Sequence, residues 1–170
     1  MAEAHRVLVV LDDSHGDKLP DLVRSGPVWI VDTPPNRAAA QSFWAANPGR
    51  THLNGITTFK FEAGTPPEDI LINELATIDL HHGIYSGDGP YAMLEVVGAH
   101  LDETLKSKLG LFGFREFQTT SEGFRATRAV SLELQPVLLH QMPEGAVGDA
   151  EQVGGFGLHP ATLIERVLQE

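Results

Sequence analysis

Polar side chains that could do chemistry follow three short apolar segments of the chain. They are Asp12, Asp13, Ser14 and His15 after residues 7–11, Asp32 and Thr33 after residues 28–31, and Glu62 after residues 56–61. If these segments are strands of an open α/β sheet, their carboxyl ends lie at one edge, where such sheets bind ligands. We therefore expect these side chains to gather at that edge.

The carboxylates of this group have the chemistry of a divalent-cation site. Asp12, Asp13 and Asp32 would ligate magnesium or manganese, because hard cations prefer oxygen ligands. His15 would then act as acid or base on a small anionic or phosphorylated substrate, and Ser14, His15 and Thr33 would bind the ligand. The alternative is structural, since Asp, Ser and Thr also cap helices in strand-to-helix loops. The sequence alone leaves both interpretations open.

Several catalytic signatures are missing from the sequence. The chain has no cysteine, which excludes disulfides and thiolate chemistry. It also lacks the Gly-x-Ser-x-Gly nucleophile motif, and residues 154–157 do not have the spacing of a phosphate loop. We therefore expect a non-catalytic binding or interaction protein with no cofactor. The alternative is a divalent-metal-dependent enzyme that uses magnesium or manganese.

Two strand-to-helix junctions carry the same Thr-Pro-Pro motif. Thr33 precedes Pro34 and Pro35, and Thr65 precedes Pro66, Pro67 and Glu68. Threonine is a good N-cap, and proline fits the first helical turn because its missing N–H would have no partner there. Thr65 and Glu68 also have capping-box spacing. The sequence predicts that both threonine hydroxyls cap helices.

Hydrophobic patterning predicts an α/β fold: an open three-layer sheet of about six strands, mostly parallel, with an antiparallel edge hairpin and a C-terminal extension. The hairpin joins residues 114–120 to 124–134 through a three-residue loop, which sets Phe114 opposite Val130 and Glu116 opposite Arg128. The other expected strands are residues 7–11, 28–31, 56–61 and 91–97, and the expected helices are residues 18–24, 34–46, 66–80 and 101–112.

Two further groups of charged or titratable residues receive structural interpretations. His81 and His82 follow the third predicted helix and should cap its C-terminus, where the helix dipole favours histidine. Arg115, Arg125 and Arg128 lie in the predicted hairpin, and such charges on edge strands stay in solvent and deter edge pairing. The alternative is that they receive a small anion or an acidic surface of the same protein.

The last thirty residues differ in composition from the rest of the chain. We expect a single α/β domain over residues 1–140, followed by a Gly-rich loop and a short docking helix over residues 141–170. That helix, residues 160–168, carries an apolar stripe that must dock because so short a helix is unstable alone. We expect the stripe at a two-fold interface, which makes the protein a homodimer, and the alternative is that it docks on its own domain. The stripe consists of Leu163, Ile164, Val167 and Leu168.

Composition and charge restrict the classes of partner that the protein can bind. The 12 Lys and Arg against 23 Asp and Glu give a net charge of −11. Residues 61–105 contain no Lys or Arg at all, so a phosphate backbone would be repelled and nucleic-acid binding is not expected. No stretch has the length and hydropathy of a membrane span or a signal peptide, which predicts a cytoplasmic protein. Its small-molecule or protein partner is not identified by these features.

Overall fold

The computed structural model describes residues 6–51, 54–85 and 91–129, with the backbone alone for residues 83–85. The chain divides into two units between Leu132 and Glu133, and all of the described residues belong to the first. The expected end of the domain at residue 140, the Gly-rich loop and the C-terminal helix all lie outside the described residues.

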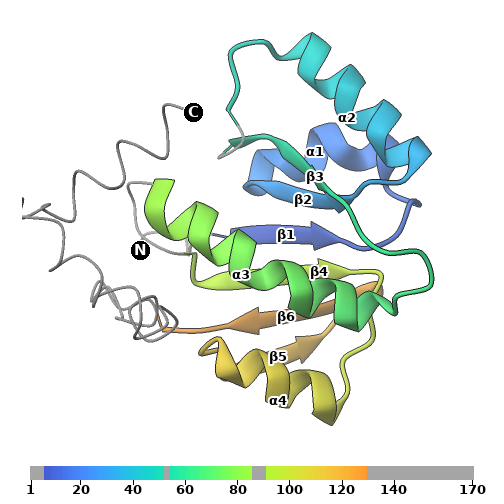
Figure 1. The fold of residues 1–170 in the computed structure, drawn as a ribbon. Coiled ribbons are helices and arrows are strands. Elements are labelled where there is room, and N and C mark those ends of the chain that lie inside the picture. Colours follow the sequence, from blue (N-terminus) through green and yellow to red (C-terminus); the bar gives the residue numbers. More distant parts are fainter. Residues whose placement is uncertain (1–5, 52–53, 86–90, 130–170) are drawn as a thin grey trace, which may run out of the picture. The chain divides into compact units, whose positions relative to one another are not determined.

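A six-stranded mixed sheet forms the centre of the first unit (Figure 1). Its strand order is β3-β2-β1-β4-β6-β5, in which β1 to β4 are mutually parallel and β6 is antiparallel to β4 and to β5. The strands are β1 (Arg6–Val10), β2 (Val28–Val31), β3 (Ile56–Phe59), β4 (Met93–Val97), β5 (Glu116–Thr119) and β6 (Gly123–Thr127). The predicted α/β fold with an antiparallel edge hairpin is confirmed.

Helices cover both faces of this sheet and make three layers (Figure 1). The core on one face joins the sheet to α1 (Leu19–Leu22), which two 3-10 turns flank, and to α2 (Pro34–Ala46). The core on the other face joins it to α3 (Pro67–Tyr85) and α4 (Glu103–Leu111). In β1, Val7 and Val9 enter one core while Leu8 and Val10 enter the other. This explains why the central strand is apolar from Val7 to Val10.

The hairpin register differs by one residue from the predicted one. Glu116 pairs with Thr127, not with Arg128, and Thr119 pairs with Phe124. The reason is that Gly123 belongs to β6: a Cβ on Gly123 would overlap the carbonyl oxygen of Val96 in β4, so only glycine fits there. The expected partner of Phe114, Val130, lies outside the described residues.

Arg128 is not a solvated edge charge, contrary to the prediction. Its side chain is only 11% exposed and makes two 3.0 Å bonds to the carboxylate of Asp79 in α3. The guanidinium lies 4.5 Å from the ring centre of Tyr91 and 4.7 Å from that of Phe114. It also donates to the carbonyl oxygen of Phe112 at the end of α4. Arg128 therefore fastens α3 and α4 to the sheet.

The helix α3 continues to Tyr85, beyond its predicted end at residue 80, so His81 and His82 belong to the helix and do not follow it. His82 lies inside the helix rather than after it, and its side chain is fully buried. Its Nε2 accepts a hydrogen bond from the indole Nε1 of Trp29 in β2. A local sequence pattern does not reveal this burial of His82 against the sheet. The predicted capping of the helix C-terminus stays a prediction.

The threonine caps are likewise not found as predicted. Thr33 has the extended backbone of an N-cap before α2, but its hydroxyl makes no capping hydrogen bond. At α3 the carbonyl of Pro66 accepts the first helical bonds, so Thr65 lies one residue too early. Glu68 does not complete a capping box either, because the backbone N–H of Thr65 donates to the carbonyl oxygen of Glu62. The Glu68 carboxylate accepts from the backbone N–H of His100. A side-chain cap does form at α4, where Asp102 accepts from the N–H of Leu105.

Candidate functional site

The strand order places a topological switch point between β1 and β4. From β1 the chain goes to β2 on one side, whereas from β3 it crosses to β4 on the other side. Ligands of open α/β sheets bind at such a point, outside the carboxyl ends of the strands. Asp12 follows β1 there, and Gly98, with φ of +85°, follows β4. A Cβ on Gly98 would lie 3.0–3.1 Å from atoms of Asp12, so the two loops are in close contact.

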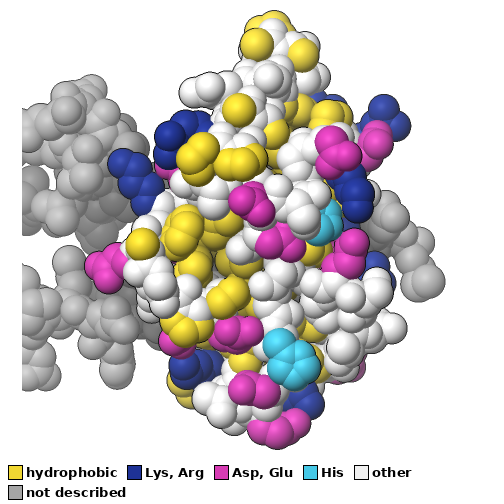
Figure 2. Space-filling model, turned by 90° about the vertical axis from the view of Figure 1, so that its right-hand side faces the viewer, with side chains coloured by type: hydrophobic (Ala, Val, Ile, Leu, Met, Phe, Trp, Pro, Cys, Tyr) yellow, Lys and Arg dark blue, Asp and Glu magenta, His cyan; other side chains and the backbone are white. Residues whose placement is uncertain are grey.

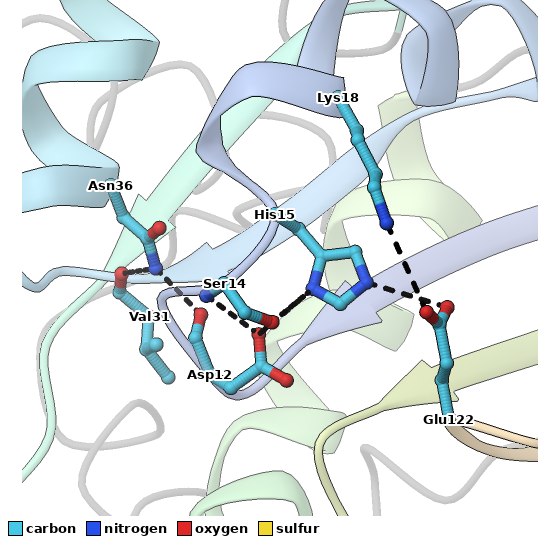
Figure 3. Close-up of polar contacts among 7 residues, drawn as sticks. All are labelled: Asp12, Ser14, His15, Lys18, Val31, Asn36 and Glu122. Atoms are coloured by element: carbon cyan, nitrogen blue, oxygen red, sulfur yellow. Dashed lines mark hydrogen bonds and ion pairs between the residues drawn. The ribbon is translucent and has the colours of Figure 1, made fainter.

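Asp12 is the centre of a local hydrogen-bond cluster (Figure 3). Its Oδ1 accepts from the backbone N–H of Ser14 at 3.1 Å and from the Ser14 hydroxyl at 2.9 Å, and it lies 2.9 Å from Nδ1 of His15. Partial burial acts to raise the pKa of Asp12, but the hydrogen bonds from His15 and Ser14 outweigh it, and the pKa falls below its ordinary value. The carboxylate is therefore ionised at neutral pH.

The ring of His15 is held between two carboxylates from distant parts of the chain (Figure 3). The residue is only 5% exposed; Nδ1 faces Asp12, and Nε2 lies 3.4 Å from Oε2 of Glu122, 107 residues away in the β5–β6 turn. Nζ of Lys18 lies 3.9 Å from the other oxygen of Glu122. The carbonyl oxygen of Glu122 accepts from the N–H of Gly98 at 3.0 Å, which fixes the turn beside the switch point.

Ser14, His15 and Asp12 do not form a nucleophilic triad. The Ser14 hydroxyl is 2.8 Å from Nδ1 of His15, which is the same nitrogen that faces Asp12. In a working triad the nucleophile and the carboxylate occupy opposite nitrogens of the ring, so that the ring can pass a proton between them. Here Nε2, on the side of Glu122, is the nitrogen that could exchange a proton with a bound molecule.

Asn36 braces this site from α2, and sequence patterns did not identify it. Its side chain is fully buried, and its Nδ2 donates to the carbonyl oxygens of Asp12, at 2.9 Å, and Val31, at 3.0 Å. The ends of β1 and β2 are thereby tied to one helix. The Oδ1 of Asn36 and the hydroxyl of Thr33 make no hydrogen bond within the part of the chain that the structure describes.

The remaining predicted residues lie outside this cluster. Asp13 is exposed, and the carboxylate of Asp32 is bound by Arg37 through two hydrogen bonds of 2.8 and 3.1 Å. The hydrogen bond from Arg37 lowers the pKa of Asp32. Among residues 6–51, 54–85 and 91–129, no three His, Asp or Glu side chains are arranged to hold a metal ion. The metal site therefore stays a prediction.

Glu62 lies in a separate small pocket at the end of β3. Glu74 of α3 lies in the same pocket, and burial raises its pKa. The other lining residues are Lys60, Phe61, Thr65, Ile70 and Asn73. Figure 2 views the molecule from the carboxyl ends of the parallel strands, where acidic and histidine side chains lie among apolar ones.

Sequence patterns did not identify four residues of this site, because the strand order brings them to it. They are Lys18, Asn36, Gly98 and Glu122.

No protein-family model, curated protein or solved structure matches the chain. Among the described helices, none combines the length and the apolar character that crossing a membrane requires.

Proposed function

We propose that this is a cytoplasmic binding protein whose ligand is a small molecule held at the switch point between β1 and β4. One observation carries the proposal: His15 and Glu122, from segments 107 residues apart, converge where open α/β sheets bind ligands. The turn that bears Glu122 is fixed by its backbone bond to Gly98, so the site is organised before any ligand arrives.

The chemistry of the site favours a ligand with N–H donors or positive charge. Glu122 is an exposed carboxylate of the site, and Lys18 is the single cation in contact with the cluster within the described chain. The nearby start of α2 attracts anions poorly, because its first two residues, Pro34 and Pro35, have no N–H to donate. An amine or a guanidinium compound fits these groups better than a phosphate does.

A divalent cation is the second candidate, and with it a metal-dependent enzyme. Asp12 supports it, since this carboxylate keeps its charge and only one of its oxygens carries the three hydrogen bonds described above. Hard cations bind such oxygens. In that case His15 would supply the acid or base through Nε2.

Thermal unfolding with defined probes tests both candidates. The probes are a set of small amines and guanidinium compounds, magnesium, manganese and inorganic phosphate. A ligand at one hundred times its Kd stabilises the fold by about 2.7 kcal/mol, which raises Tm by several degrees. We expect an amine or guanidinium compound to raise Tm, and His15→Gln and Glu122→Gln to abolish that shift.

Matched controls come from exposed residues of the same types. His100→Gln and Glu103→Gln change side chains outside the cluster and should leave the shift intact. Equal shifts in site and control variants would show that binding occurs elsewhere. A shift with magnesium or manganese alone would favour the metal-dependent enzyme, and a shift with phosphate alone would contradict the proposed ligand chemistry.

A further inference from the structure

The pocket at the end of β3 is separate from the candidate site, and the function proposed above does not use it. Its walls come from the segment that follows β3, residues 60–65, and from the first half of α3. β3 is an edge strand of the sheet, and β2 separates it from β1 (Figure 1). The pocket has a volume of about 190 Å³, which is less than the roughly 300–1,000 Å³ of sites for drug-sized ligands. Its occupant must therefore be a small molecule.

A tight turn forms one wall of the pocket. The backbone N–H of Thr65 donates to the carbonyl oxygen of Glu62 at 3.1 Å, and Gly64, the third residue of this turn, has φ of +85°. A type II turn requires a positive φ at its third residue. The other wall is the regular helix α3, whose Ile70 is buried. The backbone of the protein therefore forms both walls before any ligand binds.

The polar side chains that line the pocket are uncommitted. Within the described residues, the side chains of Lys60, Glu62 and Asn73 make no hydrogen bond and no ion pair, and the same holds for Glu74. Burial raises the pKa of Glu74, because a carboxylate that loses water without gaining a partner is destabilised. A cationic group bound beside Glu74 would offset this cost.

The charges of the lining select a ligand that carries both signs. The carboxylates of Glu62 and Glu74 would bind an ammonium group, whereas Lys60 and the amide N–H groups of Asn73 would bind a carboxylate. A simple amine would leave the ammonium group of Lys60 as a repelling charge, and a simple anion would face two carboxylates. A zwitterion uses every charged group of the pocket.

The apolar part of the lining gives the nature of the rest of the ligand. It consists of the side chains of Phe61 and Ile70, and Phe61 is 39% exposed. An aliphatic group placed over this ring would remove apolar surface from water.

We propose that the pocket binds a free amino acid with an aliphatic side chain, for which leucine is the probe. The ammonium group of the ligand contacts Glu62 and Glu74, and its carboxylate contacts Lys60 and Asn73. Its side chain covers Phe61. This site is additional to the one at the switch point and shares no residue with it.

An NMR titration of the isotope-labelled full chain with leucine tests the proposal. We expect the amide resonances of residues 60–65 and 70–74 to move, and those of Ser14 and Glu122 report any binding at the switch point instead. Two analogues separate the charges of the ligand: isoamylamine lacks the carboxylate of leucine, and isocaproate lacks its ammonium group. Each should bind about tenfold more weakly than leucine, as expected for the loss of a charge-assisted hydrogen bond.

Substitutions in the pocket test the same contacts from the side of the protein. Glu74→Gln and Lys60→Met should each lower the affinity for leucine by about tenfold. Without ligand, Glu74→Gln should unfold at the same temperature as the parent or at a higher one, because it removes a partly buried charge that has no partner. Glu103→Gln and Lys106→Met, which change a surface ion pair of α4, are matched controls and should keep the parent's affinity.

The proposal is overturned if leucine moves no resonance around the pocket, or moves only those at the switch point. It is also overturned if isoamylamine or isocaproate binds as tightly as leucine, or if Glu74→Gln and Lys60→Met keep the parent's affinity. The titrations of the parent with leucine and its two analogues need no substitution, so they remain decisive if a variant fails to fold.

Discussion

At the scale of single residues, the site combines a local cluster with one long-range contact. Asp12, Ser14 and His15 are neighbours in sequence, and their mutual hydrogen bonds follow from a turn after a strand. Their types and position could therefore be predicted. Glu122 and Asn36 reach the same place from a hairpin turn and from α2, and no spacing in the sequence connects them to Asp12. Side chains that converge by tertiary folding leave no local pattern.

Asp12→Asn should destabilise the protein by about 1 kcal/mol at pH 7, because an amide is a weaker acceptor than a carboxylate. The folded-state pKa of Asp12 is lowered, so its contribution is present above the ordinary value of 3.8 and is lost as pH falls through the folded value. Urea unfolding at pH 7 and at pH 2 measures this contribution. The difference in the free energy of unfolding between the variant and the parent should be smaller at pH 2. Asp13→Asn, at an exposed neighbour, should leave stability unchanged. A difference of the same size at both pH values would contradict this origin.

At the scale of elements, the alternation of strands and helices could be predicted from the sequence. The hairpin register and the end of α3 could not, because they depend on contacts between residues that are distant in sequence. The limits of β2 and α2 agree with the predicted residues 28–31 and 34–46, since Pro27, Pro34 and Pro35 mark them locally. The hairpin register was wrong because β4, not the turn, decides it: β6 pairs with β4 over its whole length. The end of α3 was predicted too early for a similar reason. A polar residue such as His82 suggests a helix end in the sequence, whereas in the fold His82 is buried and bound by Trp29 of β2.

The contrast between two glycines tests whether β4 sets the hairpin register. Gly123→Ala should destabilise the protein by about 2 kcal/mol or more, because the added methyl group would overlap the Val96 carbonyl and force β6 away from β4. Gly110→Ala in α4 meets only ordinary contact, 3.5 Å from Arg115, and should stabilise the protein by about 0.5–1 kcal/mol. Thermal and urea unfolding of the two variants give both values. Equal effects of the two substitutions would mean that the close approach at Gly123 does not hold the register.

At the scale of the whole molecule, acidic charge and sheet topology favour the same kind of ligand. The net charge of −11 repels anions at long range, and the switch point presents carboxylates at short range. Composition predicted the net negative charge. The carboxylates at the switch point could be identified only with the strand order, because the β5–β6 turn reaches His15 when β4 lies beside β1 and β6 lies beside β4. The sequence therefore predicted the edge at which chemistry would lie, but not the full set of groups there.

The predicted homodimer can be tested on the complete chain and on a shortened one. Residues 160–168 carry the apolar stripe described above, and each side chain of the stripe would gain about 2 kcal/mol from burial. At a two-fold interface the stripe is buried in both subunits at once. Light scattering should therefore give twice the chain mass for the full protein and the mass of one chain after truncation behind Met142, with a lower Tm. The Tm of the full protein should also rise with protein concentration, because dimerisation stabilises the fold by mass action. As a control, the full chain carrying Leu163→Asp and Val167→Asp should behave like the truncated one. If truncation leaves both mass and Tm unchanged, the C-terminal stripe plays no part in assembly.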